Sequence, residues 1–170
     1  LRSTCQVVRF LAACKQRGIA GVNEPLDKAA EWLLVALRNA STEARADLLW
    51  ALSACDKSRF ESLNSLQRSR TSLSPDGLSR LCLAWHASKR PEGAGEVLDT
   101  LRSKVTAAAL AKLPAETLAL VTQALLLSDR RDALGTAGLQ ALQAARVGAA
   151  WDTVEATAAA LAAVTQAQQA

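Results

Sequence analysis

The sequence contains few of the residues that favour β-sheets. Its 170 residues include no tyrosine, no methionine and only two phenylalanines, and the β-branched apolar residues are ten valines and one isoleucine. Strands are enriched in valine, isoleucine, tyrosine and phenylalanine, so the scarcity of these residues argues against a β-sandwich, a barrel and a parallel α/β sheet. Alanine and leucine, with 36 and 28 copies, dominate instead, and both rank high in helix propensity. We therefore expect an all-α protein.

Residues that bind metals or carry out catalysis are also scarce. The chain has one histidine, His86, and its four cysteines form no Cys-x-x-Cys pair, so we expect no metal site and no cofactor. No Gly-x-Ser-x-Gly or His-Glu-x-x-His motif occurs, and the short segment Gly93-Ala-Gly95 lacks the strand that a phosphate-binding loop needs. The sequence thus predicts a protein that is not an enzyme, with no catalytic residue and no small-molecule substrate.

The cysteines lie in apolar helical patterns, where a free thiol packs as a small hydrophobic group. A reducing compartment is the simplest interpretation of four such thiols. They are Cys5, Cys14, Cys55 and Cys82.

No apolar run approaches the roughly 18 residues that span a membrane, so we expect no membrane insertion. The chain starts at Leu1 and contains no methionine, which fits a mature protein, a fragment or the ordered part of something longer. A removed targeting segment would agree with this start, but none is visible in the chain.

Charge is distributed unevenly along the chain. Residues 1–112 hold 17 basic and 11 acidic residues, whereas residues 113–170 hold three basic and five acidic residues. A polyanionic partner is therefore expected to contact the first two thirds of the chain.

A ten-residue pattern recurs along the chain with apolar residues at its second, fifth, sixth and ninth positions. That spacing marks one face of a helix, and the small fifth residue would let a neighbouring helix approach closely. Successive copies begin 41, 33, 40 and 35 residues apart, which suits a helix–turn–helix repeat. The copies are 6–15, 47–56, 80–89, 120–129 and 155–164.

Each copy lies in the first (A) helix of a pair, and second (B) helices are expected at 25–39, 59–70, 93–111 and 131–145. Ser41 and Ser74 are expected to cap A helices, with Pro75 and Pro114 at first helical positions. Nine helices in four pairs plus one are expected to stack into an α-solenoid, because one pair alone cannot bury its apolar face. We expect a single domain over 1–170, with repeats at 3–40, 41–72, 73–112 and 113–147 and a terminal helix at 148–167.

The pattern resembles two organellar helical-hairpin repeat families, the heptatricopeptide repeats often found beside RAP domains and the octotricopeptide repeats. This resemblance is carried by Leu-Leu-Trp-Ala-Leu-Ser-Ala-Cys at 48–55, Leu-Ser-Pro-Asp-Gly-Leu-Ser-Arg-Leu at 73–81 and Leu-Pro-Ala-Glu-Thr-Leu-Ala-Leu-Val at 113–121. It implies a role in organellar RNA metabolism or in a mitochondrial ribosome. It also implies a mitochondrial location, with the plastid as the alternative. The chain departs from these families in having no RAP domain, no Pro-Pro-x-x-Trp element and unequal repeat spacings.

Two basic residues lie at each A-to-B turn, and equivalent turns of a solenoid line up along one edge. We expect this edge and the end of the second B helix to contact RNA phosphates, which gives affinity without sequence information. The alternative is that the cations stabilise helix C-termini, where the helix dipole is negative. The residues are Lys15, Arg17, Lys57, Arg59, Arg68, Arg70, Lys89, Arg90, Arg130 and Arg131.

The four tryptophans lie in or beside apolar helical patterns and are expected to pack in the core, with Trp50 at the most variable position. The last A helix has no B helix after it, so its alanine face needs a cover. We expect a neighbouring protein to supply that cover. The residues of this expected protein contact are Trp151, Ala156, Ala159, Ala160 and Ala163.

Two functions remain open at this point. The first is a non-catalytic RNA-associated protein, either a structural subunit of an organellar ribosome bound to rRNA or an RNA-processing factor. The second is a protein–protein scaffold or assembly subunit of a respiratory or ATP synthase complex, with no RNA contact. A combination is also open, in which residues 1–112 contact RNA and residues 113–170 pack on neighbouring proteins.

Overall fold

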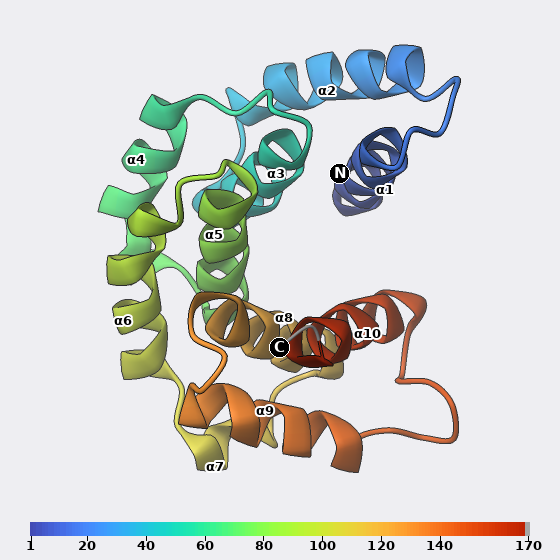
Figure 1. Ribbon diagram of the computed structural model, residues 1–170. Coiled ribbons are helices and arrows are strands. Elements are labelled where there is room, and N and C mark those ends of the chain that lie inside the picture. The colour runs from blue at the N-terminus through green and yellow to red at the C-terminus, as the bar shows by residue number, and fades with distance from the viewer. Residues whose placement is uncertain (169–170) are drawn as a thin grey trace. The chain divides into compact units, whose positions relative to one another are not determined.

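The computed structural model describes residues 1–168 (Figure 1). These residues form ten α-helices and two short 3-10 helices without a strand, and an isolated β-bridge joins Val147 to Ala150. The predicted all-α class is confirmed. The chain divides into two compact units, Leu1–Val97 (unit 1) and Leu98–Ala170 (unit 2), and each is described by itself. The expectation of one continuous domain over 1–170 stays a prediction.

Unit 1 has two layers of helices (Figure 1). The A helices α1, α3 and α5 form a row in which α3 contacts both of the others, and the B helices α2 and α4 pack against this row. Helix α6 crosses the boundary between the units. The bounds are α1 Arg2–Gln16, α2 Asn23–Leu37, α3 Thr42–Ala54, α4 Phe60–Arg68, η1 Arg70–Ser72, α5 Pro75–Ala87, η2 Pro91–Ala94 and α6 Gly95–Lys104.

Unit 2 is built around α8, which packs against both α9 and α10, while the short helix α7 contacts α9. Its bounds are α7 Ala107–Leu110, α8 Ala115–Ser128, α9 Ala133–Ala144 and α10 Val154–Gln168. Of the helices in the described chain, none is long and apolar enough to cross a membrane.

Three local predictions can be compared directly with the helix ends. Ser41 and Ser74 do cap α3 and α5, and Pro75 is the first residue of α5. Pro114, however, lies one residue before α8 rather than inside it. The single helix predicted at 93–111 is wrong: Thr106 is extended and its side chain accepts a hydrogen bond from the Ala109 N–H, which starts the separate helix α7.

The three A-to-B turns of unit 1 share one backbone motif. After α3, the Lys57 N–H donates to the Leu52 carbonyl at 2.8 Å and Asp56 has a positive φ of 58°. The turns after α1 and α5 repeat this Schellman arrangement, in which a left-handed residue closes the helix. The left-handed residues are Gly18, Asp56 and Lys89.

This shared motif corrects the alignment of the first repeat. The left-handed residues are 38 and 33 residues apart, so the first A helix aligns as 9–18 and not as 6–15. Aligning the apolar positions does not detect this shift of three residues, because a helix presents nearly the same face again after three or four residues. The turn motif fixes the register where the apolar pattern alone does not.

In the corrected alignment, Arg9, Asp47 and Arg80 occupy equivalent positions of α1, α3 and α5. They form a ladder of charges across the row: Asp47 Oδ1 accepts from Arg9 Nη1 at 2.9 Å and from Arg80 Nη1 at 2.8 Å. Arg80 also donates to the two carboxylate oxygens of Asp76 at 3.0 and 3.1 Å. The ladder is buried, since the Arg80 and Asp47 side chains are only 3% and 9% exposed. It ties the three A helices of unit 1 together.

The tryptophans follow the core prediction in two of four positions. Trp85 and Trp151 are buried, and Trp85 packs edge-to-face on Phe60. Trp50 is half-buried under the Arg9 guanidinium, which lies 3.8 Å from the ring centre. The core prediction is wrong for Trp32, which is 51% exposed, because its side of α2 faces away from α1 and α3.

Candidate functional site

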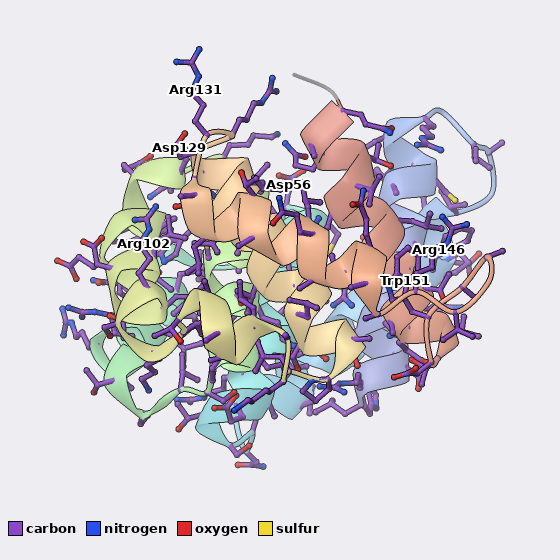
Figure 2. The ribbon with its side chains drawn as sticks, turned by 90° about the horizontal axis from the view of Figure 1, so that it is seen from below. Asp56, Arg102, Asp129, Arg131, Arg146 and Trp151 are labelled. Carbon is purple, nitrogen blue, oxygen red and sulfur yellow. The ribbon has the colours of Figure 1, made fainter. Side chains whose placement is uncertain are left out.

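Five of the ten basic residues predicted to contact phosphate are exposed, and within residues 1–168 their side chains have no carboxylate partner. Exposed, unpaired cations are the groups that remain available to an anionic ligand. Figure 2 shows Arg131 extending away from the turn between α8 and α9. The five are Lys15, Arg17, Arg59, Arg68 and Arg131.

The other five have contacts within the described chain. Lys57, Arg70 and Lys89 form ion pairs at 3.2, 3.1 and 3.7 Å, Arg90 lies over an aromatic ring at 5.0 Å, and Arg130 also interacts within the chain. The partners of the first four are Asp27, Glu96, Asp56 and Phe60, in that order. The cationic edge is therefore partly neutralised by the protein itself.

Two successive turns of unit 1 lie side by side. The ion pair between Lys89 and Asp56 joins the turn after α5 to the turn after α3, and both residues are the left-handed residues of their turns. Both side chains are more than 70% exposed, so this pair adds little stability. It nevertheless shows that equivalent turns are neighbours within this unit.

A groove lies beside these turns, between the B helices α2 and α4. It consists of two adjoining hollows of about 300 and 260 Å³ that share Leu34, Leu37 and Leu49. Leu49 and Leu52 of α3 are buried beneath it and form an apolar floor. Serine side chains line the α4 side. The groove is thus apolar at its base and polar at its rim.

The rim of this groove is strongly cationic. It includes Arg38, Arg45 and Arg59, and within the described chain none of the three guanidinium groups has a carboxylate partner. Lys57 adds a fourth cation that is already paired, and Glu61 is the one carboxylate among the lining residues of the two hollows. Four cations and one acid around an apolar floor make this the strongest candidate binding site in unit 1.

The sequence placed only Lys57 and Arg59 of this rim in the candidate site. Arg38 directly follows α2, and Arg45 lies in the first turns of α3, so neither belongs to an A-to-B turn. The short segment between these helices brings the two residues to the same groove. The sequence held one sign of this site: Arg38 and Arg45 flank the connection between a predicted B helix and the next A helix.

The alanine face of α10 is covered within unit 2. Ala156, Ala160 and Ala163 are at most 2% exposed and α10 packs on α8, while Ala159 is half-buried. Trp151 is buried as well, and its Nε1 donates to the Leu142 carbonyl at 2.9 Å. The expectation that another protein covers this face is wrong, because α8 of the same unit is the neighbour that the alanines require.

Trp151, labelled in Figure 2, lies beside the end of α9, where its Nε1 meets the Leu142 carbonyl. Thr157 of α10 accepts a hydrogen bond from the Trp151 N–H at 3.1 Å. These bonds fix the connection that leads from α9 into α10, so Trp151 serves the fold of unit 2.

No protein-family model, curated protein or solved structure matches this chain. The resemblance to organellar repeat families therefore rests on the sequence pattern alone.

Burial shifts the pKa values of side chains in the described chain, among them Cys5 and His86. Burial raises the pKa of the Cys5 thiol to about 12, and burial lowers the pKa of His86. Among residues 1–168, no three His, Cys, Asp or Glu side chains are grouped so that they could hold a metal ion.

Asp132 caps α9 and links it to α6. Burial alone would raise its pKa, but hydrogen bonds from Arg102 and from the Gly135 N–H lower it below its usual range. The Arg102 Nη2 lies 2.7 Å from the carboxylate. Figure 2 labels Arg102.

Proposed function

We propose that the protein is a non-catalytic, RNA-associated α-solenoid of about four helix–turn–helix repeats and a terminal helix. Its cations contact RNA phosphates from the A-to-B turns and from the rim of the α2–α4 groove. The observation that carries this proposal is the convergence of three unpaired guanidinium groups, from Arg38, Arg45 and Arg59, on one groove.

Guanidinium groups suit phosphate because their planar donors bind two oxygens at once. Unit 1 carries 14 basic and 10 acidic residues, and Lys15 and Arg17 extend the supply of exposed cations along its turns. The groove floor is made of leucines and offers no aromatic ring for base stacking. This favours contacts to the RNA backbone with little base specificity.

We further propose, from the sequence resemblance, that the RNA is organellar and that it is rRNA in a mitochondrial ribosome with neighbouring proteins around it. An organellar RNA-processing factor would use the same surface, and a plastid location is the alternative.

Fluorescence anisotropy with a labelled 20-nucleotide single-stranded RNA tests the phosphate contacts. The variant Arg38→Ala/Arg45→Ala/Arg59→Ala should bind roughly tenfold to a hundredfold more weakly than the unchanged chain at about 0.1 M salt. The matched control removes three exposed cations away from the groove, in Lys28→Ala/Lys112→Ala/Arg146→Ala. Equal losses in the two variants would refute a role for the groove.

A protein scaffold is the second candidate function, and the leucine floor of the groove favours it. An apolar groove with a cationic rim also fits an acidic amphipathic helix from a partner protein. Co-purification before and after ribonuclease treatment separates the two functions. Partners lost on digestion indicate RNA association, and partners that persist indicate a scaffold.

A further inference from the structure

The first A helix, α1, exposes an apolar face that the third A helix buries. Val7 and Phe10 are 52% and 67% exposed, and Ala13 is exposed as well. In the corrected alignment, their equivalents in α5 are each fully buried in unit 1. Those equivalents are Leu78, Leu81 and Ala84. The exposed face of α1 therefore lies where a preceding A helix would pack.

The last A helix, α10, exposes an apolar face on the side where a following A helix would pack. Val154 and Leu161 are 82% and 54% exposed, and Ala158 between them is exposed too. Val154 and Ala158 are the equivalents of Val8 and Ala12, which α1 buries in its core with α2 and α3. This face of α10 is thus the one on which a following A helix would pack.

In the contact between α1 and α3, the face of one A helix that packs on a following helix meets the face of the next that packs on a preceding helix. The buried cluster contains Val8 and Ala12 from α1 together with Leu48, Ala51 and Leu52 from α3. Packing α10 of one copy onto α1 of another would repeat this contact and extend the row of A helices. No new type of interface is required.

The charge ladder favours a second copy as the occupant. Its alternation runs Arg9, Asp47, Arg80, and Arg9 is the last rung on the side of the exposed face. In the apolar alignment of the sequence, Glu155 of α10 falls in the same column as Asp47 of α3, and it is half-buried. A second copy's α10 would therefore place Glu155 next to Arg9 and add a negative rung to the ladder.

The charges of the two helices are also complementary as a whole. The charged side chains of α1 are all basic, whereas the one charged side chain of α10 is Glu155. Packing α1 on α1 of a second copy would bring cations together, which is unfavourable at close range. The complementary pairing is α10 on α1.

We propose that the protein self-associates head to tail, with the Val154, Ala158 and Leu161 face of α10 packed on the Val7, Phe10 and Ala13 face of α1 in the next copy. Such an interface joins two different surfaces, so it produces an open chain of copies or a closed ring. The proposal does not depend on RNA binding.

Analytical ultracentrifugation of the 170-residue chain, purified after ribonuclease treatment, tests the proposal. The average mass should rise with concentration between about 5 and 200 μM, the range in which weak protein contacts form. Phe10→Asp and Leu161→Asp should each remain monomeric, because a carboxylate would be buried in the interface. The control Val35→Asp, on an exposed site of α2, should associate like the unchanged chain. Circular dichroism checks that each variant keeps its helices.

Mixing the two variants gives the sharpest readout. Phe10→Asp keeps an intact α10 and Leu161→Asp keeps an intact α1, so an equimolar mixture should form a dimer and nothing larger. A symmetric α1–α1 contact would instead leave Leu161→Asp able to dimerise alone. Dimerisation of Leu161→Asp alone would overturn the proposal. So would an unchanged chain that stays monomeric up to about 200 μM, or self-association that neither variant weakens.

Discussion

Replacing Asp47 by alanine tests whether the row of A helices in unit 1 depends on its buried charges. Asp47 contacts both Arg9 and Arg80, at 2.9 and 2.8 Å. Its removal leaves two guanidinium groups without their shared partner in a region that water scarcely reaches. The loss of one member of a buried ion pair typically destabilises a protein by about 3 to 5 kcal/mol.

The structure sets the expected value near the lower end of that range. Arg80 keeps its hydrogen bonds to Asp76, and Arg9 keeps its contact with the Trp50 ring. The Arg9 side chain is 17% exposed and can regain some water. We expect a loss of about 3 kcal/mol, which corresponds to a fall in Tm of roughly 12 to 24 °C for a unit of this size.

Urea unfolding followed by tryptophan fluorescence measures this loss, because Trp50 stacks beside the ladder. The control is Asp27→Ala, which removes a half-exposed carboxylate paired with Lys57 and should change the free energy of unfolding by less than about 1 kcal/mol. If Asp47→Ala and Asp27→Ala lose the same stability, the ladder does not hold the row together.

Three further predictions concern packing and capping. Gly93→Ala should destabilise unit 1 by about 1 to 3 kcal/mol in urea unfolding, because the added Cβ would lie 2.5 Å from Cε3 of Trp85; an unchanged midpoint would contradict this close contact. Asp132→Ala should cost about 1 to 2 kcal/mol in unit 2 through loss of the α9 cap to the Gly135 N–H, whereas Asp132→Asn should retain most of the cap; equal losses would contradict a capping role. The pKa of Asp132 is lower in the folded chain than in the unfolded chain, so its contribution to folding stability is fully present above the ordinary carboxyl pKa and is lost as pH falls through the folded pKa. Thermal melts from pH 7 to 2 should therefore show a smaller acid-induced fall in Tm for Asp132→Ala than for the unchanged chain.

The helical class and most helix positions could be predicted from the sequence because they depend on local properties. Ala and Leu content, apolar spacing and the caps at Ser41 and Ser74 all act within a few residues of the chain. The break at Thr106 was missed because its residues also suit a continuous helix, and only the cap geometry separates α6 from α7. The register of α1 was missed because apolar columns repeat after three or four residues.

The candidate site was predicted only in part because it depends on contacts between distant residues. The positions of exposed cations such as Arg17 and Arg59 follow from their turns. The neutralisation of Arg70 by Glu96 and the formation of the groove between α2 and α4, which Arg38 and Arg45 line, depend on how the helices pack. Pattern alone also assigned the alanine face of α10 to a partner, although α8 covers it.

The salt dependence of RNA binding tests the proposed function most directly. A plot of log K against log salt concentration for single-stranded RNA falls with a slope of about 0.7 per phosphate contact, so Arg38→Ala/Arg45→Ala/Arg59→Ala should flatten the slope by about 2. The same slope and affinity in this variant and in the unchanged chain would contradict phosphate binding at the groove.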